Sequence, residues 1–129
     1  MPIETTNIPH IGEQWPEQGG VYAGLARGFD GEPDAHLVLL PDEPAGKLSW
    51  PAAVKWAKGL GNEARLPTRF ESALLYTNLQ DQFRTDDWYW TGTQYSDYNA
   101  FVQDFYYGYQ HYDYKKYEGR CRAVRRFVL

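Results

Sequence analysis

The stretch Arg65-Leu-Pro-Thr-Arg-Phe-Glu71 begins a predicted helix in the middle of the chain. Thr68 and Glu71 have the spacing of a capping box, in which the hydroxyl and the carboxylate accept hydrogen bonds from the free amides of a helix start. Apolar residues follow at helical spacing: Phe70, Leu74, Leu75 and Leu79. The pattern predicts a helix over residues 68–80.

Another helix and a hairpin are predicted upstream of this stretch. Ser49 precedes Pro51, which suits a first helical turn because the amide that proline lacks has no intrahelical partner there. Apolar residues again follow at helical spacing: Ala53, Trp56, Ala57 and Leu60. Before this helix, residues 19–26 and 35–40 are predicted strands, and Asp30-Gly31 between them is typical of a hairpin turn.

Downstream of residue 88 the pattern changes to strands. The runs 88–91, 100–107, 109–116 and 120–128 are separated by Gly92, Gly108 and Gly119, which is typical of an antiparallel meander. Strands on both sides of a central helical pair indicate an α+β fold. Residues 1–17, with several prolines and glycines, predict an N-terminal arm before a single domain over 18–129.

Alternation along residues 100–107 assigns two faces to that strand. Phe101 and Phe105 are predicted to face the core, so Asp104 and Tyr106 are predicted to face solvent.

Charge is unevenly distributed, with a formal net value of −4. That value argues against a general nucleic-acid binder, which needs an excess of lysine and arginine. Residues 1–46 hold eight acids and one base, whereas six of the thirteen bases lie in the last fifteen residues. We therefore expect a basic C-terminal strand that faces acidic N-terminal partners. Arg122, Arg125 and Arg126 are expected to pair with carboxylates such as Glu71, or to line a solvent-facing sheet edge.

The sequence predicts neither a metal site nor a cofactor. The histidines His10, His36 and His111 fall in different elements without zinc-ligand spacing. Asp86-Asp87 and the segment 30–34 are predicted turns in preference to calcium loops. The single cysteine, Cys121, allows no intramolecular disulfide and fits a buried small apolar residue.

The N-terminal sequence shows no signal-peptide pattern, and no apolar run approaches membrane-spanning length. We therefore expect synthesis in the cytoplasm and no membrane insertion.

Four short motifs line up, in order, with a known family: Gly19–Gly24 (GGVYAG), Arg65–Thr68 (RLPT), Tyr89–Thr93 (YWTGT) and Arg122–Phe127 (RAVRRF). Over residues 18–128 the chain resembles the Lcl C-terminal-domain-like proteins, a bacterial and phage group within the C-type lectin and formylglycine-generating-enzyme fold superfamily. The resemblance implies a C-type-lectin-like fold, with two helices flanking small antiparallel sheets and with paired N- and C-terminal strands. It also implies a phage or prophage source and a place on the virion, and some relatives are variable proteins of diversity-generating retroelements.

Tyrosine is concentrated near the C-terminus, where nine of the eleven tyrosines lie between residues 89 and 117. Tyrosine offers a large, rigid contact area with a polar tip, and for that reason antibody-type binding surfaces are rich in it. Tyr89, between two tryptophans, is predicted to be core, and Tyr107 is assigned to the framework. The predicted ligand-binding residues are Tyr95, Asp97, Tyr98, Asp104, Tyr106, Tyr109, His111, Tyr112, Asp113 and Tyr114.

These features favour a non-enzymatic module that binds a protein or glycan receptor through its tyrosine-rich segment. One alternative is a phage virion or tail-assembly protein that uses the same patch to form a homo-oligomer. Another is an enzyme of the formylglycine-generating type, although such enzymes need a pair of active-site cysteines and this chain has one. The calcium motifs with which true C-type lectins bind sugars are also absent from the sequence.

Overall fold

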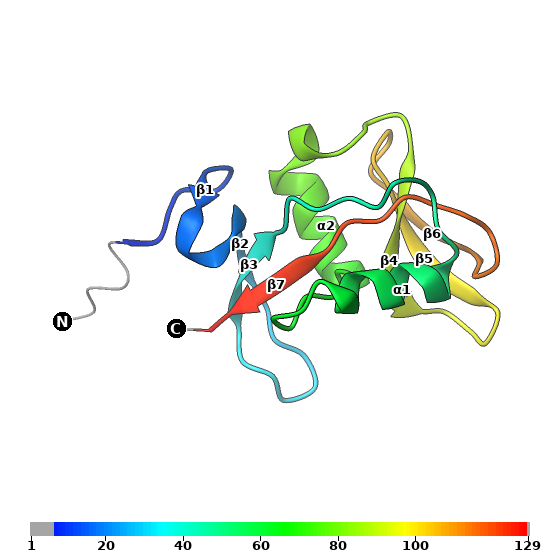
Figure 1. Ribbon diagram of the computed structural model, residues 1–129, viewed down its shortest axis with the longest axis horizontal. Coiled ribbons are helices and arrows are strands. Elements are labelled where there is room, and N and C mark those ends of the chain that lie inside the picture. Colours follow the sequence, from blue (N-terminus) through cyan, green and yellow to red (C-terminus); the bar gives the residue numbers. More distant parts are fainter. Residues whose placement is uncertain (1–6, 129) are drawn as a thin grey trace.

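The structure is a computed structural model that describes residues 7–128, and it has an α+β fold, as predicted. Two helices accompany two small antiparallel sheets, and α2 lies between the sheets in Figure 1. The four-stranded sheet has the order β1-β2-β3-β7, with β1 at Gln14–Trp15, β2 at Gly20–Ala26, β3 at Ala35–Leu39 and β7 at Val124–Phe127. The three-stranded sheet has the order β4-β5-β6, with β4 at Trp88–Gln94, β5 at Asn99–Asp104 and β6 at Gln110–Tyr114.

The predicted N-terminal hairpin is confirmed, since β2 pairs antiparallel with β3. Asp30 and Gly31 in its loop both have positive φ angles, 55° and 84°, which is the left-handed conformation that aspartate and glycine tolerate in such turns. The C-terminal strand β7 pairs with β3, so both ends of the domain share one sheet. β1 adds two residues of the predicted arm to this sheet and buries Trp15, while the first six residues of the arm lie outside the described range.

Both predicted helices are present, with the predicted starts. Helix α1 spans Trp50–Gly59 with Ser49 at its N-cap and proline in its first turn. Helix α2 spans Arg69–Asn78, and its capping box is complete: the Glu71 amide donates to the Thr68 hydroxyl, and the Thr68 amide donates to the Glu71 carboxylate. Two short 3-10 turns, Pro16–Gln18 and Gln80–Gln82, complete the helical elements.

The predicted meander is confirmed for β4, β5 and β6 but not for the last run. Residues 124–127 leave the meander and join the N-terminal hairpin as β7. Gly92 does not end its strand; it lies inside β4 and donates its amide hydrogen to the Pro67 carbonyl at 2.7 Å. The start of α2 is thereby tied to the second sheet.

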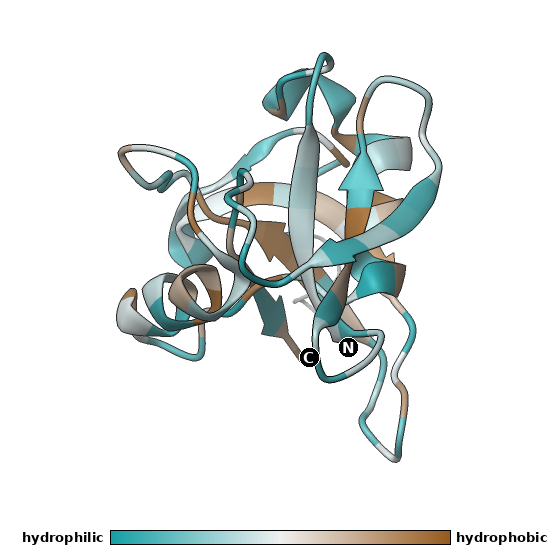
Figure 2. Cartoon of the chain, turned by 90° about the vertical axis from the view of Figure 1, so that its right-hand side faces the viewer, coloured by the Kyte–Doolittle hydropathy of each residue, from teal (hydrophilic) through white to brown (hydrophobic). Residues whose placement is uncertain are grey.

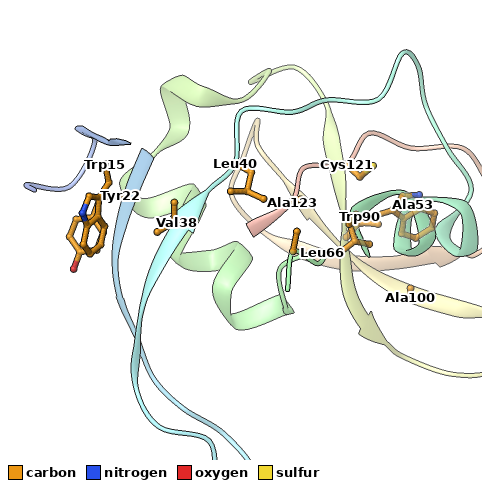
Figure 3. Close-up of a cluster of buried hydrophobic side chains, with 13 residues drawn as sticks. Trp15, Tyr22, Val38, Leu40, Ala53, Leu66, Trp90, Ala100, Cys121 and Ala123 are labelled. Carbon is orange, nitrogen blue, oxygen red and sulfur yellow. The ribbon is translucent and has the colours of Figure 1, made fainter. Parts of the chain in front are cut away.

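The core has two apolar clusters, one of which reaches from β1 and β2 to α1 and β4 in Figure 3. The prediction that β5 has a buried and a solvent face is wrong, because both faces are covered. Ala100 and Val102 are fully buried beside Trp90, while Gln103 is buried on the opposite face. The unexpected cover comes from the apolar cluster that Ala100 and Val102 share with Ala53 and Ala57 of α1 and with Cys121.

Buried Glu71 connects α2 to the C-terminal strand. Arg65 donates to both of its carboxylate oxygens, at 2.7 and 2.8 Å, and Arg126 donates to one of them at 2.7 Å. Burial is the largest influence on Glu71 and opposes ionisation. The hydrogen bonds from both arginines and the Thr68 amide, with the charge of Arg65, outweigh it and lower the pKa of Glu71 below its ordinary value. The expected pairing of Arg126 with Glu71 is confirmed.

The other arginine expectations are corrected. Arg122 neither meets a carboxylate nor faces solvent: it is buried and donates to the Gln82 and Leu40 carbonyls. Arg125 bonds to neutral Gln18. The expected acidic N-terminal partners are wrong, because the carboxylates that pair with C-terminal bases in the described residues belong to Glu71 and Asp87. Glu71 lies in the first turn of α2 and Asp87 directly precedes β4, and each pairs there with an arginine of the C-terminal segment.

Candidate functional site: a tyrosine-rich surface

The second sheet and its turns carry a set of exposed rings that we call the tyrosine surface. Its eight members have exposed fractions between 47% and 76%: Tyr95, Tyr98, Tyr106, Tyr107, Tyr109, Tyr112, Tyr114 and Tyr117. Figure 2 faces this side of the molecule and shows white and teal strand segments beside brown ones. Exposed rings in such number are rare on a small monomer and mark interaction surfaces.

At one end of the surface, Tyr95 stacks on Tyr112 with ring centroids 3.8 Å apart and planes within 6°. Phe101 meets the Tyr95 ring edge-on, and the Arg69 guanidinium lies 3.8 Å above the Phe101 ring. A hydrogen bond with Tyr95 is the main cause that raises the pKa of the Tyr112 hydroxyl. The two rings therefore act as one flat aromatic unit anchored on the start of α2.

The Gln110 side chain holds Arg69, the residue of α2 that anchors the aromatic unit. Its side-chain amide donates to the Arg69 carbonyl at 2.6 Å and to the Gln103 side chain at 2.8 Å, and its oxygen accepts from the Arg69 guanidinium at 3.1 Å. Gln103 is fully buried, so it holds its side of this hydrogen-bond network in place. The sequence alone gave no signal for it, because the three residues are up to 41 positions apart.

A groove of about 880 Å³ lies where the surface meets the start of α1. Three of the predicted site residues, Asp97, Tyr98 and Tyr114, line it together with four others: Ser49, Pro51, Lys115 and Lys116. Lys115 is held by Gln94 and by the Asp97 carbonyl, and its ammonium lies 4.8 Å from the Trp50 ring centre. The groove thus offers rings, a carboxylate, a hydroxyl and ammonium groups within the size range of ligand sites.

At the opposite end, the turn between β5 and β6 presents a row of rings. Tyr107 contacts Tyr106 and Tyr109 with centroids 4.5 and 6.0 Å away, and the Tyr109 centroid lies 5.6 Å from that of His111. Asp104 accepts the Tyr107 amide at 2.6 Å and so shapes the turn. The assignment of Tyr107 to the framework is wrong, because its ring is exposed.

The predicted site residues thus fall into three neighbouring groups along β6 and its two turns. Tyr106 is exposed and Tyr89 is core, as predicted. Asp104 is half-buried and supports the turn, and Asp113 accepts the amide of the next residue, Tyr114, at 3.1 Å. Sequence reasoning missed Ser49, Pro51 and the two groove lysines, because nothing in the sequence places the α1 start beside β6.

The remaining candidate residues, Cys121, Asp86 and Asp87, have structural roles. Burial raises the pKa of the Cys121 thiol to about 12, so it is a poor nucleophile. Asp87 pairs with Arg120 at 2.7 Å, and Asp86 pairs with Arg84 at 3.0 Å. Within residues 7–128 no cluster of three His, Cys, Asp or Glu side chains could hold a metal ion. None of the helices in that range is long and apolar enough to cross a membrane.

A scan of the chain against protein-family models gives no match, and a search of curated proteins gives none either.

Proposed function

We propose that this protein is a non-enzymatic binding module whose tyrosine surface contacts a protein or glycan receptor. The observation that carries the proposal is the exposure of eight tyrosines on one small sheet and its turns. Tyrosine loses little rotamer entropy on binding, and its ring and hydroxyl serve apolar and polar contacts together. The groove beside Tyr98 and Tyr114 adds a concave site with charged groups at its rim.

We also propose, from the resemblance to the Lcl C-terminal-domain-like proteins, that the fold is C-type-lectin-like and that the source is a phage or prophage. The shared sheet of the N-terminal hairpin and β7 supports the fold proposal. A formylglycine-generating type of enzyme is disfavoured by the burial and high pKa of Cys121. In the alternative virion-assembly role, the same surface would be covered by further copies of the chain and not by a receptor.

The test is binding to glycan and protein arrays by the purified chain. We expect discrete binding that is lost when Tyr98, Tyr106 and Tyr114 are replaced together by Ala. A matched control replaces exposed apolar residues outside the tyrosine surface, Leu25→Ala with Phe29→Ala, and should bind as the wild type does. Equal loss in both variants, or no binding above background by the wild type, would rule the proposal out.

A further inference from the structure

Strand β6 is an open edge of the second sheet. Two of the other sheet edges are bridged: β4 donates to the Arg120 and Pro67 carbonyls, and β7 is bridged at Val124 by Arg65 through hydrogen bonds of 2.8 and 3.1 Å. β1 is only two residues long. Among the described residues, β6 is therefore the one longer edge strand whose outer side has no strand or bridge against it.

The direction of the free backbone groups follows from the pairing with β5. The Asp104 amide donates to the Tyr109 carbonyl at 3.0 Å, and the Lys115 amide donates to the Tyr98 carbonyl at 2.8 Å. Since antiparallel hydrogen bonds alternate, residues 109, 111, 113 and 115 face β5. The N–H and C=O groups of Gln110, Tyr112 and Tyr114 therefore point outward.

This edge has little of the usual protection against pairing. Natural edge strands carry charged residues, above all lysine, or a proline or a bulge that blocks a second chain; Gln110–Tyr114 contains no proline, lysine or bulge, and its one carboxylate is Asp113. At Tyr114 the outward groups have local partners, because its amide donates to Asp113 and its carbonyl accepts from Tyr117. Gln110 and Tyr112 thus lie in the open part of the edge.

The sequence of the edge is complementary to itself. When two copies of β6 run antiparallel about a two-fold axis at Tyr112, the outward groups of Tyr112 face each other in a hydrogen-bonded pair. Gln110 then lies opposite Tyr114 of the second copy, whose outward groups would exchange their local partners, Asp113 and Tyr117, for Gln110. In the same register His111 lies opposite Asp113 of the second copy, twice, in the close non-hydrogen-bonded position where side chains interact most strongly.

We propose that β6 pairs antiparallel with β6 of a second copy, centred on Tyr112, to give a two-fold dimer with one continuous sheet. Each symmetric His111–Asp113 contact places a donor-bearing imidazole beside a carboxylate, whereas a two-fold axis at residue 111 or 113 would set His111 opposite His111 or Asp113 opposite Asp113. The turn rings and the groove lie at the ends of β6, so the dimer would present two tyrosine surfaces side by side and gain avidity for a repeated receptor. The pairing itself does not depend on that receptor.

The first test is disulfide trapping at the axis. Cα atoms of a hydrogen-bonded antiparallel pair lie about 5.5 Å apart, within disulfide reach. Tyr112→Cys should therefore form a cross-linked dimer under mild oxidation. The matched control is His111→Cys, whose two copies lie more than about 7 Å apart in this register and should cross-link far less. Native Cys121 is buried and gives little background.

The second test is a charge exchange followed by sedimentation velocity over a dilution series. His111→Asp sets carboxylates opposite each other and should weaken dimerisation by about tenfold. Adding Asp113→His to that variant restores the opposite pairing and should recover the dimer. A wild type that stays monomeric throughout, equal cross-linking at positions 111 and 112, or no recovery in the double variant would each overturn the proposal. If the wild type binds the arrays but stays monomeric, the proposed function holds and the dimer proposal fails.

Discussion

The Glu71 side chain is 3% exposed, and its carboxylate accepts four hydrogen bonds. Three donors hold its carboxylate, from Arg65, Arg126 and the Thr68 amide. Its pKa is lowered overall, so its stabilising effect is present above its ordinary value of 4.5 and is lost as pH falls through the lower folded value. The free energy of unfolding should therefore decline in acid below about pH 4.5.

Removing this charge should be costly. Glu71→Gln keeps the size of the side chain but leaves two arginines without their carboxylate, and we expect a loss of about 3 kcal/mol in urea unfolding at pH 7. The acid-dependent decline should be smaller in the variant. Asp86→Asn, which removes an exposed carboxylate also paired with arginine, is the control and should have little effect. Similar losses in both variants would contradict the role given to Glu71.

Cys121 gives a second prediction at the scale of one residue. With a pKa of about 12, roughly one thiol in ten thousand is ionised at pH 8. The folded protein should therefore react with a disulfide reagent such as DTNB orders of magnitude more slowly than the chain in guanidinium chloride. Rapid labelling of the folded protein would show that the thiol is accessible and would reopen the enzymatic alternative.

The turn between β5 and β6 positions the exposed rings at one end of the tyrosine surface. Gly108 has a φ of +91°, and a Cβ there would lie 2.5 Å from the Tyr76 ring of α2. Gly108→Ala should cost about 1–3 kcal/mol of stability, since it combines a left-handed backbone with a close contact. Thermal unfolding measures the loss. Gly31→Ala also has a positive φ but meets open space, so a larger loss there would contradict the contribution of the Tyr76 contact.

Local signals explain which elements the sequence could predict. The capping box of Thr68 and Glu71, the proline after Ser49 and the Asp30-Gly31 turn each act within a few residues, and all three structures are present. The two faces of β5 were mispredicted because Val102 packs in an apolar cluster with α1 and Cys121, which are long-range contacts with no local sign. Strand β7 leaves the meander because it pairs with β3, which is also a long-range contact.

At the scale of the whole molecule, composition predicted where the candidate site lies but not how it is organised. The tyrosine count located it, yet the groove depends on α1 meeting the β6 end, where the Trp50 amide donates to the Lys115 carbonyl at 2.9 Å. The aromatic stack likewise depends on the docking of α2 through Arg69. Both helices thus support the surface that the second sheet displays.

The central claim is that the rings along β6 form a display surface and not a core. The most direct measurement compares melting temperature and array binding of a triple variant, with Tyr109, Tyr112 and Tyr114 all replaced by Ala, at concentrations too low for dimers. We expect binding to vanish while the melting temperature falls by no more than about 5 °C, whereas Tyr89→Ala, which truncates a buried ring, should lower it by more than about 10 °C. A fall in the triple variant as large as that of Tyr89→Ala would show that these rings are core and would contradict the claim.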